Sequence, residues 1–160
     1  MKDEQSAPVP TGALLLAVVA LIWIGMILGI SGLATPIKFQ AASLTLPVAL
    51  DVGQTTFAAF NKMEWLLAAV LAIAVLPCRP ALLSLRLLLT VAAVITVLLQ
   101  TFWLLPALDQ RVAAVIAGEV LPPSGLHNLY VVAEGVKLLA LIVLGMGALW
   151  TLMARADRGV

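Results

Sequence analysis

The sequence predicts an all-α integral membrane protein, a four-helix transmembrane bundle with helices projecting on the non-cytoplasmic side. Of the 160 residues, 63% are hydrophobic and 11% are charged, whereas soluble domains are about 45–50% apolar and 25% charged. Four apolar runs are long enough to cross a bilayer. They lie near residues 13–35, 47–76, 81–105 and 124–154. The short connections between them favour antiparallel neighbours.

The chain divides into one transmembrane domain and two tails. Residues 1–12 are polar and contain prolines, residues 13–156 hold the spans, and residues 157–160 form the C-terminal tail. The SGLA stretch before Thr35 resembles a signal-peptide cleavage site. The apolar core, however, exceeds the usual length of about 7 to 15 residues, and the leading segment is acidic as well as basic, so we expect a retained helix.

Prolines set the expected helix boundaries. Pro36 should end or kink the first helix, and Pro47 suits the first turn of the second. Pro106 is expected to kink the third helix, with residues 107–119 continuing as a short amphipathic piece outside the membrane. Ser124 is expected to cap the fourth helix.

The basic residues are scattered singly and leave a formal charge of +1. They form no patch able to follow a phosphate backbone, so nucleic acid is not an expected partner. The single cysteine, Cys78, cannot close an internal disulfide, and we interpret it as a small apolar residue rather than a redox or metal ligand. The expected partners are the lipid bilayer and either further copies of the chain or other membrane protein subunits, with no cofactor.

Lysines and arginines in the short flanking segments set the expected orientation. Both termini are predicted to be cytoplasmic, in a bacterial inner membrane, because basic residues are in excess on that side. The cytoplasmic set is Lys2, Arg79, Arg86, Arg155 and Arg158, and the outer set is Lys38, Lys62 and Arg111.

Glycines share one face of the first apolar run. Gly25, Gly29 and Gly32 lie close together there, and such spacing lets a neighbouring helix approach closely. The sequence leaves two interpretations open, a packing seam inside the bundle and a contact between copies of the chain.

Four polar side chains lie on one face of the fourth apolar run, within about 80° of one another around the helix axis. They are the ionisable residues His127, Glu134 and Lys137, and Tyr130. Counting about 1.5 Å per residue from the cytoplasmic arginines puts Glu64 and Gln100 roughly 20 Å deep. The same count from Arg155 puts Lys137 at roughly 27 Å and Glu134 near 31 Å.

We therefore expect a polar intramembrane cluster of Glu64, Gln100, Glu134 and Lys137 in the outer half of the bundle, opened to water near His127. Ionisable groups at membrane depth are expensive and face protein or a wet cavity. Two interpretations remain open: ion pairs that fix helix register, and a transport or ligand role. Further outer-side polar residues are Lys38, Asp51, Asn61, Lys62 and Asp109.

Catalytic and metal sites are not expected. His127, the only histidine, is interpreted as a hydrogen-bonding residue at a helix start, because no HxxxH, CxxC or paired-carboxylate spacing accompanies it. No GxSxG elbow or phosphate-binding glycine loop is present in the sequence. Four-helix membrane enzymes that use glutathione rely on several arginines around an anionic cofactor, whereas the outer half here offers only Arg111.

Four motifs resemble a family of small four-helix bacterial membrane proteins with a domain of unknown function. They are ATPIKF (34–39), ALDVGQTTFAAFNKMEW (49–65), LLQTFWLLPALDQR (98–111) and LHNLYVVAEGVKL (126–138). That family is distantly similar to a eukaryotic transmembrane protein associated with cisplatin resistance. The resemblance implies a four-span fold and no particular activity. The shared polar positions it implies are Lys38, Asp51, Asn61, Glu64, Asp109, His127, Glu134 and Lys137.

Two functional hypotheses follow. The first is a non-enzymatic membrane protein, either a homo-oligomer or an accessory subunit of a membrane complex, and it rests on the glycine face and on the lack of a catalytic constellation. The second is a small transporter or ligand-binding protein that uses Glu64, Glu134 and Lys137 along a polar route. From sequence alone we favour the first.

Overall fold

The structure, a computed structural model, describes residues 11–76 and 85–157, and within these ranges every regular element is a helix. Four helical spans are long and apolar enough to cross a membrane, as the sequence predicted. They are Thr11–Lys38, Leu46–Val75, Leu85–Ile116 and Leu126–Ala156. Predictions for residues 1–10, 77–84 and 158–160, among them those for Lys2, Cys78, Arg79 and Arg158, lie outside the described residues.

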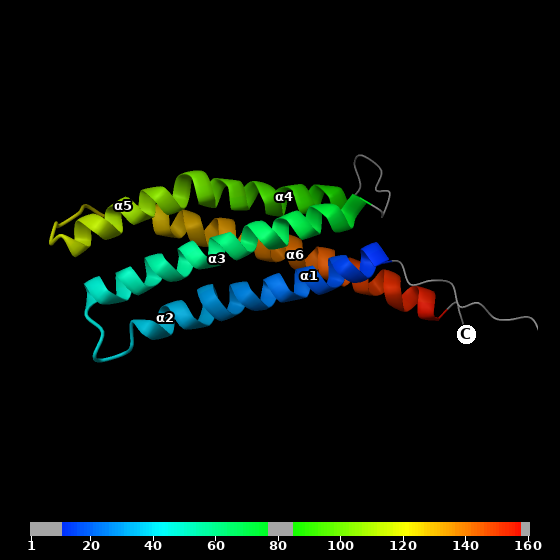
Figure 1. Ribbon diagram of the computed structural model, residues 1–160, viewed down its shortest axis with the longest axis horizontal. Helices are drawn as coiled ribbons and strands as arrows, with labels where there is room; N and C mark the ends of the chain where they lie inside the picture. Colours follow the sequence, from blue (N-terminus) through cyan, green and yellow to red (C-terminus); the bar gives the residue numbers. More distant parts are fainter. Residues whose placement is uncertain (1–10, 77–84, 158–160) are drawn as a thin grey trace, which may run out of the picture.

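Successive spans run antiparallel, so the first helix begins at the end of the bundle where the last one ends (Figure 1). The second and fourth spans are single helices, α3 (Leu46–Val75) and α6 (Leu126–Ala156). The first span begins with α1 (Thr11–Ile27) and the third with α4 (Leu85–Leu99). Both α1 and α4 pack against α3 and α6. The four spans therefore form a ring in which α3 and α6 lie on one diagonal.

Apolar side chains cover both the inside and the outside of this ring. Trp23, Leu71 and Leu141 are fully buried in the core, while Ile73 and Trp150 are exposed on its outer faces. Helices that are apolar all round are typical of membrane spans. Each span has 28 to 32 residues and therefore rises roughly 42–48 Å, longer than a hydrocarbon core of about 30 Å.

Two spans contain a π-helical segment directly before a proline. In the first span η1 (Leu28–Ala34) leads into α2 (Thr35–Lys38), and in the third η3 (Gln100–Leu104) leads into α5 (Leu105–Ile116). The residue before the proline donates its backbone N–H five residues back, Thr35 to Ile30 O and Leu105 to Gln100 O. A wider turn relieves the clash that proline causes in an α-helix.

Of the two effects expected of Pro36, an end of the first helix is contradicted, because the helix continues through the π-helical turn to Lys38. The helix also continues past Pro106 to Ile116, as expected. Pro47 lies in the first turn of α3, as predicted. The fourth helix begins at Leu126 rather than directly after Ser124, although the Ser124 hydroxyl accepts a hydrogen bond from Leu126 N at 3.2 Å.

The close packing of the first span on the last involves a glycine that the sequence analysis did not single out. A Cβ added at Gly145 of α6 would lie 3.3 Å from the Cβ of Ala20. Gly25, Gly29 and Gly32, by contrast, are exposed, and a Cβ added to any of them would meet no atom within 4 Å. A packing seam at these three glycines is therefore wrong for the described part of the chain. Their role in an oligomer contact stays a prediction.

Candidate functional site: a buried ion network beside a cavity

A buried lysine lies at the centre of the bundle. Lys137 of α6 is 0% exposed, and its ammonium group donates a hydrogen bond to Glu64 Oε1 of α3. A second bond reaches Gln100 Oε1 at 2.6 Å, and Glu134 Oε2 lies 3.0 Å from Nζ. Two of these contacts are hydrogen bonds and the third is an ion pair, so the buried ammonium group is compensated by oxygens of three side chains.

Further donors hold the two carboxylates. Trp23 Nε1 donates to Glu64 Oε1 at 3.0 Å. Gln100 Nε2 donates to Glu134 Oε2 at 2.6 Å, and the Ser31 hydroxyl donates to Glu134 Oε1 at 3.2 Å. All four spans therefore contribute to one ion network. Its members are Trp23, Ser31, Glu64, Gln100, Glu134 and Lys137.

A second contact nearer the chain termini explains why these residues meet at one height. The Arg86 guanidinium donates to Thr151 Oγ1 at 2.5 Å. Gln100 lies as many residues after Arg86 as Lys137 lies before Thr151. The contacts of Arg86 with Thr151 and of Gln100 with Lys137 therefore belong to one antiparallel register of the third and fourth spans. The depths estimated for Lys137 and Glu134 by counting residues from Arg155 were too large, because α6 extends beyond the level of Arg86.

The ion network holds two carboxylates and one ammonium group, so formal charge does not balance. Lys137 Nζ also lies 5.9 Å from the ring centres of Trp23 and Phe60, and aromatic faces attract cations. Glu64 Oε2 is buried and has no hydrogen-bond partner among the described residues. Burying each ion costs several kcal/mol before pairing, so the arrangement demands accurate geometry from every span.

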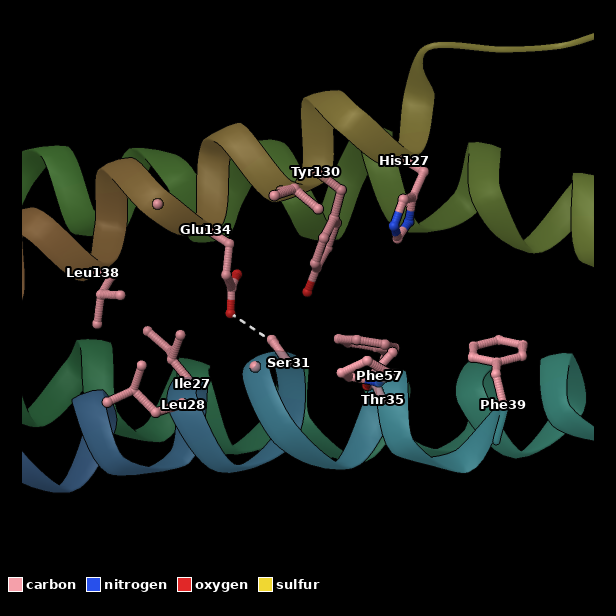
Figure 2. A pocket seen from close by; sticks show the side chains of 14 residues that line it. Ile27, Leu28, Ser31, Thr35, Phe39, Phe57, His127, Tyr130, Glu134 and Leu138 are labelled. Atoms are coloured by element: carbon pink, nitrogen blue, oxygen red, sulfur yellow. Dashed lines mark hydrogen bonds between the residues drawn. The ribbon is translucent and has the colours of Figure 1, made fainter. Parts of the chain in front are cut away.

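A cavity of about 450 Å³ lies between η1 and α6, next to the ion network (Figure 2). Its lining is mostly apolar, and Glu134 and Ser31 of the ion network form part of its wall. Figure 2 shows the Tyr130 hydroxyl pointing across the cavity toward the first span. Tyr130 is only 5% exposed, and its hydroxyl has no hydrogen-bond partner among the described residues. The cavity therefore presents a carboxylate and a free hydroxyl inside apolar walls.

A second cavity, of about 270 Å³, adjoins the first and shares Phe57, Tyr130 and His127 with it. Lys38 and Asp109, two of the expected outer-side residues, line this second cavity. His127 was expected to hydrogen-bond at the helix start, yet it makes no hydrogen bond within the described ranges. Figure 2 shows its ring facing the cavity instead.

The remaining outer-side residues do not line either of the two cavities. Asn61 is buried, and its Oδ1 accepts a hydrogen bond from the Thr101 hydroxyl at 3.0 Å. Trp65 Nε1 in turn donates to the Thr101 oxygen at 3.0 Å. Asp51 and Lys62 are exposed and line neither cavity. The sequence thus grouped residues that the fold separates.

Sequence reasoning missed Trp23, Ser31 and Thr101. Ser31 and Thr101 are polar residues inside apolar runs, each five residues before a proline, and that pattern was a usable signal because the π-helical turn forms there. Trp23 gave no signal, since an indole in the middle of an apolar run does not reveal which way its N–H points.

Comparison with known proteins adds no second source of evidence. No family model matches the chain, and searches of the curated proteins and of the solved structures found no match. Within residues 11–76 and 85–157, no group of three or more His, Cys, Asp or Glu side chains is arranged to hold a metal ion. The functional argument therefore rests on the ion network and the cavities.

Replacing the buried lysine tests the role of the ion network in stability. Lys137→Met leaves two buried carboxylates without their ammonium partner, so we expect the free energy of unfolding in detergent to fall by about 3–5 kcal/mol. Adding Glu64→Gln and Glu134→Gln removes the unpaired charges and should restore most of the loss. The control Lys62→Met, on an exposed side chain, should change stability by about 0.5 kcal/mol or less. Equal losses for the Lys62 and Lys137 variants would contradict the assignment.

Proposed function

We propose that this chain is a non-enzymatic multi-pass membrane protein that binds a small ligand in the cavity between η1 and α6, with Glu134 and Ser31 of the ion network as the polar groups in its wall. One observation carries the proposal: Glu134 belongs both to the ion network and to the cavity wall. Ion pairs that only fix helix register do not need a carboxylate in the wall of a cavity.

The cavity has the properties of a ligand site. Known small-molecule sites are about 300–1,000 Å³, mostly apolar and aromatic, with a few convergent polar groups. Here Phe57 and Tyr130 meet edge to face, with ring centres 5.4 Å apart, and Glu134 and Ser31 supply polar atoms. An ionisable group at membrane depth that faces a cavity favours a role in binding or transport.

Filling the cavity tests the proposal. Gly135 lines the cavity, and a Cβ there would meet no atom within 4 Å, so Gly135→Phe fills the space without displacing the backbone. Gly147 on the same helix is exposed, equally free of neighbours and absent from the lining, which makes Gly147→Phe the matched control. Native mass spectrometry of protein extracted from its own membranes should show a bound small molecule that Gly135→Phe loses and Gly147→Phe keeps. Identical spectra for both variants would remove the cavity as the site.

We further propose that the chain lies in a bacterial inner membrane with both termini cytoplasmic, because the excess of lysine and arginine follows the positive-inside rule. Gln110 lies in α5 and Asp157 directly follows α6, and these two parts of the chain lie at opposite ends of the bundle (Figure 1); both residues are exposed. In a Cys78→Ser background, an impermeant thiol reagent added outside should label Gln110→Cys and spare Asp157→Cys. The opposite labelling would reverse the orientation.

A second candidate function, an oligomer-forming or accessory subunit, is favoured by the exposed face of the first span. Gly25 and Gly29 lie there with nothing near them in the described chain, and small residues let a helix of another subunit approach. Purification in mild detergent should then yield a homo-oligomer or a stoichiometric partner complex. Changing both glycines to leucine should dissociate it, whereas Gly147→Leu should not. A wild-type protein that is monomeric and free of partners would exclude this candidate.

A further inference from the structure

We infer that the cavity between η1 and α6 takes a hydrophobic cation, whose positive group sits against the Glu134 carboxylate in the cavity wall. The inference rests on the proposed ligand-binding function and names the chemical class of its ligand. Two observations lead to it: the formal charge of the ion network, and the position of Glu134 within it.

The charge of the ion network leaves one negative charge unmatched. Lys137 is the one cation among the network members, and it faces both Glu64 and Glu134. Its other contact, Gln100, is neutral. Because an unbalanced buried charge is costly, one further positive charge, either a proton or a cation, completes the site.

The geometry assigns that positive charge to Glu134. Glu64 is 0% exposed, lines neither cavity, and takes the hydrogen bond from Lys137 on the same oxygen that Trp23 contacts. Glu134 lines the larger cavity, and among the described residues its Oε1 accepts only the 3.2 Å bond from Ser31. A cation entering between the apolar walls therefore reaches Glu134 first.

The neighbours of Glu134 on every packed element fit this assignment. Lys137 and Tyr130 face it from α6, Ser31 from η1 and Gln100 from η3. The Glu64 carboxylate of α3 pairs with the same lysine and so adds a second negative charge near Glu134. His127 lies farther along the same cavity wall. The aromatic faces of Tyr130 and Phe57 suit the apolar body of an ammonium ligand, and they and the Tyr130 oxygen also suit its positive edge.

Three probes of matched shape test the inference on the intact protein in detergent: benzyltrimethylammonium, its uncharged isostere neopentylbenzene, and benzylsulfonate. We expect benzyltrimethylammonium to bind the wild type about tenfold or more tightly than neopentylbenzene, because only the cation pairs with the Glu134 carboxylate. Benzylsulfonate, which carries a negative charge, should bind more weakly than either.

Glu134→Gln should reduce benzyltrimethylammonium affinity about tenfold or more and leave neopentylbenzene binding unchanged. In this variant the ion network is neutral, with Lys137 paired to Glu64. The control Asp109→Asn, in the neighbouring cavity, should keep the affinity for benzyltrimethylammonium. A uniform reduction for all three probes would indicate a folding defect, and the comparison of the three probes on the wild type then decides alone.

Different results would overturn the cation assignment and the ligand-binding proposal. Equal binding of the cationic and neutral probes, tighter binding of benzylsulfonate, or unchanged affinity in Glu134→Gln would overturn the cation assignment while leaving a ligand site in the cavity. If none of the three probes binds, or if Gly135→Phe blocks none of the binding observed, the ligand-binding proposal falls with it.

Discussion

The pairing of Lys137 with Glu64 across the diagonal of the bundle is the interaction on which the rest of the site depends. The first and third spans do not carry either charge of this pair, yet each supplies a hydrogen bond to it, the first span from Trp23 and the third from Gln100. Removing one member leaves a buried charge, whereas removing several together leaves neutral side chains. The ion network thus favours one relative arrangement of four helices whose apolar surfaces would pack in many.

Backbone chemistry places two of the partners. Pro36 and Pro106 cannot donate the hydrogen bond that an α-helix requires, and the wider turns before them carry Ser31 and the amide of Gln100. Membrane helices tolerate proline where local π-helical turns satisfy the freed backbone groups. In this chain the same adjustment brings polar side chains onto opposite sides of Glu134.

The sequence predicted the fold well because apolar runs of membrane length have few alternatives. The meeting of Glu64 with Lys137 was also predictable, since an ionisable group in such a run must face other helices. Neutral partners such as Trp23 were not, because their cost when exposed to lipid is too small to reveal their direction. The sequence could not decide between the two effects of Pro36, because the outcome depends on the turn before it. It could not decide the role of Gly25 either, because small residues suit a contact inside the bundle and a contact between subunits equally well.

The contact between Ala20 and Gly145 sets how closely the first and last spans approach each other. A Cβ added at Gly145 would lie 3.3 Å from the Cβ of Ala20, so a larger side chain at this position must push the two helices apart. The same two spans line the cavity that has Glu134 and Ser31 in its wall, whereas Gly145 lies outside that lining. We therefore expect a larger residue at Gly145 to widen the cavity although its own side chain does not reach it.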